Sequence, residues 1–524
     1  MTGFAPPREH PLRRHLVWAL VALAYLSIAP YFPRLNNPNE NVRVWMTRAI
    51  VEDGTLNIDA TVRAWGFVDD KAASGGHLYS SKAPGTSLLG VPVLWVQTRL
   101  WHAAGWPSPS QRAATLALRF ASVMPCLLLF LFAFARWVER RTGDPAARDL
   151  LVTAVGLGSI IYPYGVLFVG HAQGAAAAFG AFMALTWDDD GPGVVTPPRR
   201  LVAAGALAGA AVLFEYQLLL AALVLAGFVV WRHRAGFRWF ALGALPLAIA
   251  LGAYHTALFG RPWTFPYGHL ENQTYARVDH GSGFFGLSRP HAAALGASLF
   301  SISYGLFAFS PFLLVGLAGA VHRAWQRRGD AMVCLLVAVV LALFLAGMTH
   351  WRAGWCVGPR YIAGVAPFLA AGIALAWRDA QGRRLTGPLR VTLGALVVVS
   401  VFLNGLSAAT YPHYPEVFDN PVFDLTLPLW RDGYVPSGLG HALGLSGALA
   451  LVPVAALWLA ALTVALVAGT RGVRGALVRA GGAALMALLL LVALSRYGRR
   501  PTTAEAHATS AVRSLWDPPG PRRP

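Results

Sequence analysis

Charged side chains are scarce in this chain. Asp, Glu, Lys and Arg make up 13% of its 524 residues, whereas 56% of the residues are hydrophobic. A typical soluble domain has about 25% charged residues, and a soluble fold of this length needs more polar surface than this composition supplies. The same hydrophobicity excludes a disordered chain. Several long apolar segments instead predict an all-α polytopic membrane protein.

Cysteine and lysine are also rare. Three cysteines form neither a disulfide framework nor a zinc-ligand spacing. The only two lysines are Lys71 and Lys82, eleven positions apart in one polar segment, although the chain is rich in arginine. Two lysines kept so close together indicate a chemical role, with chance as the alternative.

The net charge of +19 has a topological explanation. The arginines cluster in short segments between apolar runs, as is typical of loops on the cytoplasmic side of a membrane. We therefore expect membrane lipids around the chain and no nucleic acid as a partner.

The arginine clusters also set the topology. Five loops are rich in arginine: 136–148, 231–238, 322–330, 378–390 and 471–479. All five lie on the cytoplasmic side only if segment 86–101 lies along the membrane surface without crossing it. This predicts about thirteen transmembrane helices and a cytoplasmic N-terminus. The predicted spans are residues 15–33, 113–136, 149–169, 171–187, 200–215, 217–231, 239–258, 300–321, 331–348, 361–377, 391–409, 441–469 and 477–494.

Long polar loops then lie outside the cell. The transmembrane domain covers residues 1–494, and its outer loops are 34–112, 259–299, 349–360 and 410–440. Residues 495–524, which are rich in Pro, Arg and Thr, are predicted to be a disordered extracytoplasmic tail.

The first outer loop carries the residues best suited to chemistry. Segment 41–53 has apolar residues at helical spacing, which predicts an amphipathic surface helix. A carboxylate at a membrane interface can act as a general base on an acceptor hydroxyl, and neighbouring cations can bind a phosphate. The alternative is a capped helix start with solvated charges. The residues concerned are Glu40, Arg43, Asp69, Asp70, Lys71 and Lys82.

This arrangement resembles the GT-C glycosyltransferases, in particular protein O-mannosyltransferases and the bacterial lipid A aminoarabinose transferase. The shared features are a first helix, an acidic-x-x-Arg element at Glu40 and Arg43, and a lysine element at Lys82 before a second surface helix. The resemblance implies a GT-C-like fold and transfer of a sugar from a polyprenyl-phosphate donor at the extracytoplasmic face, with inversion. It implies Glu40 as the base and Arg43 and Lys82 as phosphate ligands.

Two departures from the family pattern leave the base open. The family usually has Asp where this chain has Glu40, and often an acid where it has Ser81. Asp69 and Asp70 are therefore alternative bases, with Lys71 as a further phosphate ligand.

Other candidates lie at predicted outer helix ends. Arg360 is a phosphate ligand at the start of the predicted helix 361–377, because helix N-termini bind anions. Loop 259–290 has the residue types of a sugar site, and loop 410–440 is a candidate cap over an acceptor. Possible substrate contacts, each with a packing or interfacial role as the alternative, are His171, Glu215, Tyr361 and His350.

A membrane glycosyltransferase of the bacterial plasma membrane is the leading hypothesis. Its partners are a polyprenyl-phosphate-linked sugar and an envelope acceptor, which is a glycolipid, a polysaccharide or a protein. No cofactor is required, because the leaving phosphate needs only charge neutralisation; a divalent metal remains an alternative. The other classes are a transporter or lipid flippase, disfavoured by the lack of repeats and midplane charges, and a non-catalytic scaffold.

Overall fold

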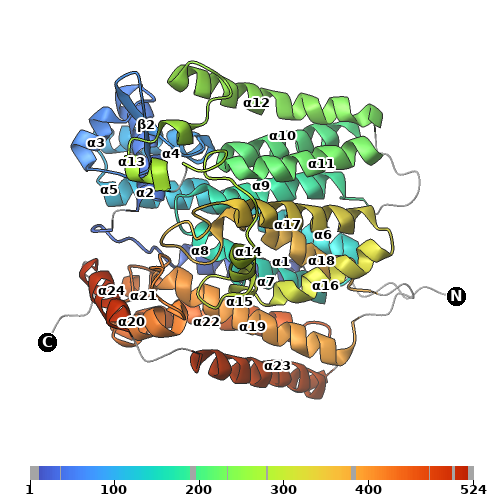
Figure 1. The fold of residues 1–524 in the computed structure, drawn as a ribbon. Coiled ribbons are helices and arrows are strands. Elements are labelled where there is room, and N and C mark those ends of the chain that lie inside the picture. The colour runs from blue at the N-terminus through green and yellow to red at the C-terminus, as the bar shows by residue number, and fades with distance from the viewer. Residues whose placement is uncertain are drawn as a thin grey trace.

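The computed structural model describes residues 11–35, 37–188, 196–232, 234–278, 281–378, 385–470, 472–497 and 502–516. Within these ranges the chain is almost wholly helical. Most of the long helices run in a similar direction across Figure 1, and the elements of residues 34–112, the predicted first outer loop, gather at one end of the bundle.

The element bounds are as follows. The helices longer than ten residues are α1 (Pro11–Leu26), α2 (Pro38–Arg48), α4 (Gly85–Ala103), α6 (Met124–Thr142), α7 (Pro145–Leu157), α9 (Gly170–Leu185), α10 (Pro198–Phe214), α11 (Leu219–Arg232), α12 (Phe237–Phe259), α16 (Phe312–Trp325), α17 (Gly329–Gly347), α18 (Val365–Leu375), α19 (Gly387–Ala409), α22 (Val452–Val467), α23 (Gly472–Ser495) and α24 (Thr503–Ser514). The shorter helices are α3 (Asp59–Trp65), α5 (Gln111–Leu118), α8 (Ile161–Gly165), α13 (Gln273–Val278), α14 (Ala292–Phe300), α15 (Leu306–Phe309), α20 (Leu427–Arg431) and α21 (Leu439–Ala442). Single π or 3-10 turns are η1 (Ala49–Asp53), η2 (Arg119–Val123), η3 (Tyr216–Leu218), η4 (Arg234–Gly236), η5 (Pro266–His269), η6 (Arg360–Ile362), η7 (Val422–Thr426) and η8 (Gly447–Leu451). Strands β1 (Lys71–Ser74) and β2 (His77–Ser80) form an antiparallel hairpin with Lys71 opposite Ser80.

The chain is a multi-pass membrane protein, but thirteen spans are not confirmed. Six helical segments of the described residues are long and apolar enough to cross a membrane: Gln111–Thr142, Arg234–Phe259, Gly329–Gly347, Gly387–Ala409, Gly447–Val467 and Gly472–Ser495. Several predicted spans are interrupted. The predicted span 149–169 divides into α7 and α8 around Gly158. The predicted span 300–321 contains the short helix α15, and the longer helix α16 begins only at Phe312, after Pro311.

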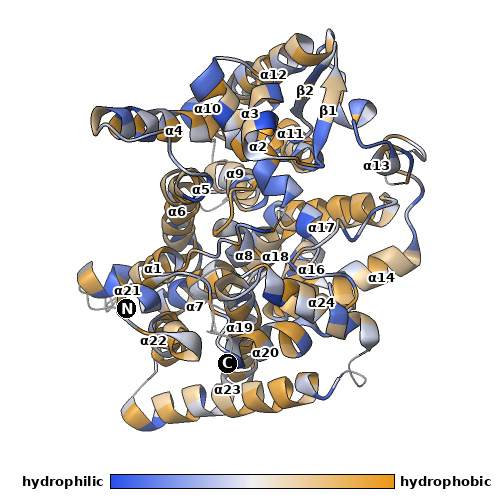
Figure 2. Ribbon diagram, turned by 90° about the vertical axis from the view of Figure 1, so that its left-hand side faces the viewer, coloured by the Kyte–Doolittle hydropathy of each residue, from blue (hydrophilic) through white to orange (hydrophobic). Residues whose placement is uncertain are grey.

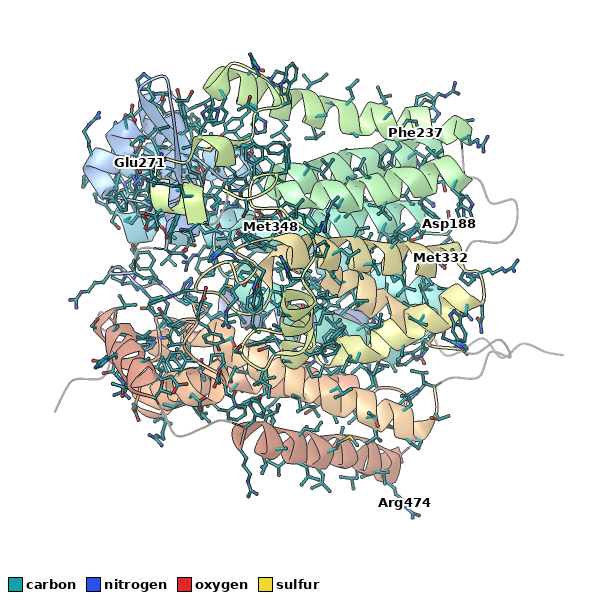
Figure 3. The ribbon with its side chains drawn as sticks, in the orientation of Figure 1. Asp188, Phe237, Glu271, Met332, Met348 and Arg474 are labelled. Atoms are coloured by element: carbon teal, nitrogen blue, oxygen red, sulfur yellow. The ribbon has the colours of Figure 1, made fainter. Side chains whose placement is uncertain are left out.

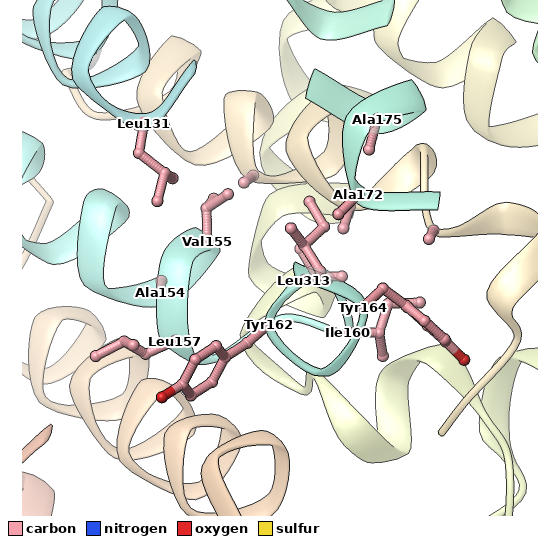
Figure 4. Close-up of a cluster of buried hydrophobic side chains, with 14 of the residues drawn as sticks. Leu131, Ala154, Val155, Leu157, Ile160, Tyr162, Tyr164, Ala172, Ala175 and Leu313 are labelled. Carbon is pink, nitrogen blue, oxygen red and sulfur yellow. The ribbon is translucent and has the colours of Figure 1, made fainter. Parts of the chain in front are cut away.

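Small residues allow the helices to pack closely. A Cβ atom added to Gly205 of α10 would lie 1.9 Å from the backbone oxygen of Phe240 in α12, and one added to Gly243 would lie 2.0 Å from the backbone oxygen of Val202. Such close approach is typical of helix pairs in membranes. Deeper in the bundle, side chains of α6, α7 and α9 meet around Val155 and Tyr162, as Figure 4 shows.

The first outer loop forms a small layered unit. Helix α2 packs against α4, and the β-hairpin packs against α2 and α3. Figure 2 shows hydrophilic residues around α3 and the hairpin, whereas α14 and α23 are largely hydrophobic. Helix α4, which contains the predicted surface segment 86–101, is not among the six membrane-length apolar helices. Its position along the membrane surface stays a prediction.

The prediction of a disordered tail is wrong for residues 502–516. Helix α24 begins with a capping box in which Thr502 and Glu505 bond each other's backbone N–H. Beyond its end, the Trp516 ring lies 4.8 Å from the Phe32 ring and 5.5 Å from the Tyr434 ring. Aromatic packing thus anchors a segment whose polar composition suggested disorder. The rest of the predicted tail beyond 497 lies outside the described residues.

Candidate active site

Glu40 is held in a buried ion pair. It lies in the first turn of α2, where Asn37 caps the helix. Arg119 Nε and Nη2 donate to its two carboxylate oxygens at 2.7 and 2.6 Å, and the backbone N–H of Phe168 donates to Oε1 at 2.6 Å. Burial acts to raise the pKa of Glu40, but Arg119 and the Phe168 N–H outweigh it, so this pKa is lowered. Both oxygens are therefore occupied, which suits a structural anchor better than a base.

Arg43 is turned toward Glu215. Its Nη2 donates to Glu215 Oε1 at 3.1 Å, and its Nη1 donates to the backbone oxygen of Asn39 at 2.8 Å. His171 Nδ1 lies 3.2 Å from the same Glu215 oxygen. The structure thus brings three predicted residues together, as a buried cluster at the N-terminal end of α9 and the C-terminal end of α10.

Asp70 and Lys82 form a second ion pair, which the β-hairpin creates. The hairpin places the two residues on either side of its open end, and Ser81 N–H donates to the backbone oxygen of Asp70. Lys82 Nζ lies 3.0 Å from Asp70 Oδ1. Burial lowers the pKa of Lys82, Asp70 opposes this, and the positive charge of Arg360 adds to the lowering.

Lys71 points away from this pair. Its Nζ lies 2.9 Å from Glu271 Oε2 and 4.0 Å from the centre of the Phe67 ring. Glu271 is labelled beside the hairpin in Figure 3. Lys71 therefore joins the first outer loop to loop 259–299, and it does not line the cavities described below.

Arg360 offers a guanidinium without a carboxylate ion pair in the part of the chain that the structure describes. Its Nε is buried and has no hydrogen-bond partner there. The predicted helix start at this point is wrong: η6 is a single turn, and α18 begins at Val365. Gly358, with a φ of +63°, and Pro359, with a ψ of 79°, both have non-helical backbone angles just before Arg360.

A polar cavity of about 460 Å³ collects most of the predicted site. Its wall includes six of the predicted residues and also Asn39, Tyr267, His413 and Glu416. Asp69 Oδ1 accepts a hydrogen bond of 3.3 Å from Asn272. The six predicted residues are Asp69, Asp70, Lys82, His350, Arg360 and Tyr361.

Two further cavities adjoin this polar cavity. An apolar cavity of about 450 Å³ shares Tyr267 and Tyr361 with it and continues between α17 and the chain around Phe285. Met348, labelled in Figure 3, is part of its wall. A second polar cavity of about 230 Å³ contains Glu40 and Arg119 and shares His413 with the first.

His413 separates the two polar cavities. Burial lowers its pKa to about 4, although the charge of Glu40 opposes the shift. The imidazole is therefore neutral at pH 7. In the described residues, no group of three or more His, Cys, Asp or Glu side chains is placed to hold a metal ion.

Sequence reasoning missed Arg119 and Tyr267 as site residues. Arg119 lies 79 positions from Glu40 and within an apolar segment, where an arginine needs a partner. That need for a partner was the signal available in the sequence. Tyr267 lay in a loop with sugar-site composition, but no spacing singled it out.

No family model and no curated protein matches the chain. Among solved structures, ArnT from Cupriavidus metallidurans bound to undecaprenyl phosphate is similar over 96% of this chain and 78% of that one, at 15% identity and a TM-score of 0.45. The oligosaccharyltransferase from Archaeoglobus fulgidus in its apo form is similar over 80% of this chain and 58% of that one, at 13% identity and a TM-score of 0.46. Arabinosyltransferase EmbB from Mycobacterium smegmatis is similar over 98% of this chain and 44% of that one, at 14% identity and a TM-score of 0.43.

All three are GT-C glycosyltransferases, the family that the first outer loop resembles. The likenesses concern the fold of distant chains. The function proposed below therefore rests on the cavities and charges of this chain.

Proposed function

We propose that this chain is a membrane glycosyltransferase that moves a sugar from a polyprenyl-phosphate donor to an acceptor hydroxyl at the outer face of a bacterial plasma membrane. The observation that carries this proposal is the junction of two cavities of similar size, one lined by charged side chains and the other almost wholly apolar. The first, about 460 Å³, is lined by three carboxylates, Asp69, Asp70 and Glu416, and by the two cations Lys82 and Arg360. The apolar one, about 450 Å³, meets it at Tyr267 and Tyr361.

A polyprenyl-phosphate sugar has the same three-part chemistry. Its hydrocarbon chain suits the apolar cavity, because burying apolar surface there is favourable. Its phosphate suits Lys82 and Arg360 at the junction. Its sugar then lies in the polar cavity beside Asp69 and Asp70.

Lys82 and Arg360 would bind the phosphate in different ways. An ammonium group has three donors, so Lys82 can keep Asp70 and still donate to a phosphate oxygen. The Arg360 guanidinium has a buried Nε without a partner, and planar guanidinium groups bind phosphate oxygens in pairs. Lys82 pairs with Oδ1 of Asp70, so Oδ2 is the atom that would take the proton of the acceptor hydroxyl.

In the proposed reaction, the acceptor hydroxyl gives its proton to Asp70 while its oxygen forms a bond to the anomeric carbon. The bond from that carbon to the phosphate oxygen breaks, and the electron pair stays on the departing polyprenyl phosphate. Lys82 and Arg360 neutralise the developing charge. Attack from the side opposite the phosphate inverts the anomeric centre. Asp69 is the alternative base, and Glu40 holds α2 in place.

Binding of undecaprenyl phosphate tests the first half of the proposal. We expect the purified full-length protein in nanodiscs to bind it, and Arg360→Ala to bind it about 10- to 100-fold more weakly, because a hydrogen bond to a charged group contributes about 1.5–3 kcal/mol. The matched control is Arg99→Ala, which removes an exposed arginine of α4 outside the cavities. Equal affinity in wild type and Arg360→Ala would contradict the phosphate site.

Activity after chelation tests the cofactor expectation. We expect transfer to continue in EDTA, because two cations already neutralise the phosphate. A loss restored by a divalent ion would show that a metal is required. Movement of the lipid across liposomes without any sugar transfer would favour a flippase.

A further inference from the structure

The second polar cavity has no role in the donor site. Its volume is about 230 Å³, below the roughly 300–1,000 Å³ of sites for drug-sized ligands. It therefore fits a small group, such as one ring of a larger molecule. It shares Leu35, Asn37 and His413 with the donor cavity, so a ligand in one cavity lies next to a ligand in the other.

One polar atom of a side chain that lines this cavity lacks a protein partner. Gln111 Oε1 is buried and has no hydrogen-bond partner among the described residues. Two further residues with polar side chains, Tyr31 and Asn41, line the same cavity. A buried acceptor without a partner costs free energy unless a ligand or water supplies a donor.

Aromatic rings form another wall of the cavity. Trp65 and Phe67 both line it, and each ring is already stacked by a cation, Arg48 and Lys71 respectively, at 4.0 Å. Phe67 is still 57% exposed. An exposed ring beside amide and hydroxyl groups suits a ligand with an apolar C–H face and a polar edge.

Charge disfavours an anion in this cavity. The Arg119 guanidinium is neutralised by Glu40 through two short hydrogen bonds. Arg34, the other arginine of this wall, is exposed to solvent and donates through Nη1 to the backbone oxygen of Ser514. A neutral saccharide ring has both properties required here: C–H groups that pack on the aromatic face and hydroxyls that bond to Gln111, Asn41 and Tyr31.

The backbone links this cavity to the proposed base. Residues 65–70 run from Trp65 and Phe67 in the second cavity to Asp69 and Asp70 in the first. We propose that the second cavity is the acceptor subsite and that its occupant is a neutral saccharide unit, so that the acceptor is a glycan or glycolipid sugar. This rests on the proposed function.

Saturation-transfer NMR on the full-length protein in nanodiscs tests this inference. The probes are a mixture of the methyl glycosides of glucose, galactose, mannose and arabinose and, separately, an N-acetylated, C-amidated peptide containing Ser and Thr. We expect saccharide signals with wild type that fall at least fivefold in Phe67→Ala and in Gln111→Leu. The control is Trp263→Ala, which removes an aromatic ring that is 72% exposed and lies outside the cavities; its signals should equal those of wild type.

Three outcomes would overturn the inference: no saccharide signal with wild type, saccharide signals unchanged in both variants, or peptide signals that are lost in Phe67→Ala. Undecaprenyl phosphate binding is measured on the same samples and should be unchanged in both variants. If wild type does not bind undecaprenyl phosphate, the donor site is refuted and the saccharide subsite is not. The proposed function and the acceptor inference are therefore tested by different results. Equal thermal unfolding of the variants and wild type serves as the folding check.

Discussion

The ion pair between Glu40 and Arg119 gives a prediction whose size follows from its burial. The two side chains are 5% and 3% exposed and are joined by hydrogen bonds of 2.7 and 2.6 Å. Replacing Glu40 by Gln leaves the Arg119 charge buried without an opposite charge. Breaking a buried pair in this way costs about 3–5 kcal/mol. We therefore expect Glu40→Gln to lower the free energy of unfolding by that amount.

The assay is unfolding in mixed detergent and SDS micelles, followed by tryptophan fluorescence. A double-mutant cycle with Arg119→Met should give a coupling energy of about 0.5–3 kcal/mol, because the second change removes the stranded charge. The control is Asp188→Asn at the opposite end of the bundle (Figure 3), where the carboxylate is 32% exposed. Its exposed ion pairs predict a loss of about 0–1 kcal/mol.

One result would refute this reasoning. If Glu40→Gln unfolds like wild type, shows no coupling to Arg119→Met and abolishes sugar transfer, Glu40 is the base after all. The family pattern would then have located the base correctly, and Asp70 would be only the partner of Lys82.

Three further predictions concern pH and packing. Burial lowers the pKa of Lys82, so the ammonium loses its charge as the pH rises toward 10.5. In titration calorimetry, undecaprenyl phosphate should therefore bind well to wild type at pH 8 and more weakly toward pH 10.5, whereas Lys82→Arg should bind it equally at both pH values. Equal affinity of wild type at both pH values would contradict this. The pKa of His413 is about 4 in the folded protein, against 6.5 in the unfolded chain. The free energy of unfolding should therefore fall by up to about 3 kcal/mol as the pH falls from 6.5 to 4, because only the unfolded chain takes up the proton readily. This fall should be absent in His413→Gln. Gly205→Val should lower the thermal midpoint by forcing α10 from α12, whereas Gly227→Ala, whose added Cβ meets nothing within 4 Å, should not; equal midpoints would refute the packing argument.

The sequence predicts the parts of the site that are close along the chain. Asp70 and Lys82 are eleven residues apart, and a hairpin brings them within 3.0 Å. The amphipathic pattern of 41–53 predicts a surface helix, although α2 is more deeply buried than that pattern indicates. Composition alone establishes a multi-pass membrane protein.

Contacts across the fold could not be read in this way. The partner of Glu40 comes from η2, and the partner of Lys71 comes from loop 259–299, 200 residues later. No local pattern specifies which of many arginines pairs with a given acid. The number of spans also depends on breaks such as Gly158, because hydropathy averaged along the chain conceals a single turn.

The most direct test of the central claim is mass spectrometry of envelope glycans and glycolipids from a strain lacking this protein, rescued with wild type, Asp70→Asn or Arg99→Ala at equal expression. The account predicts a mass loss of one sugar residue in the deletion strain, restored by wild type and Arg99→Ala but not by Asp70→Asn. Identical envelope masses in all four strains, or full rescue by Asp70→Asn, would contradict it.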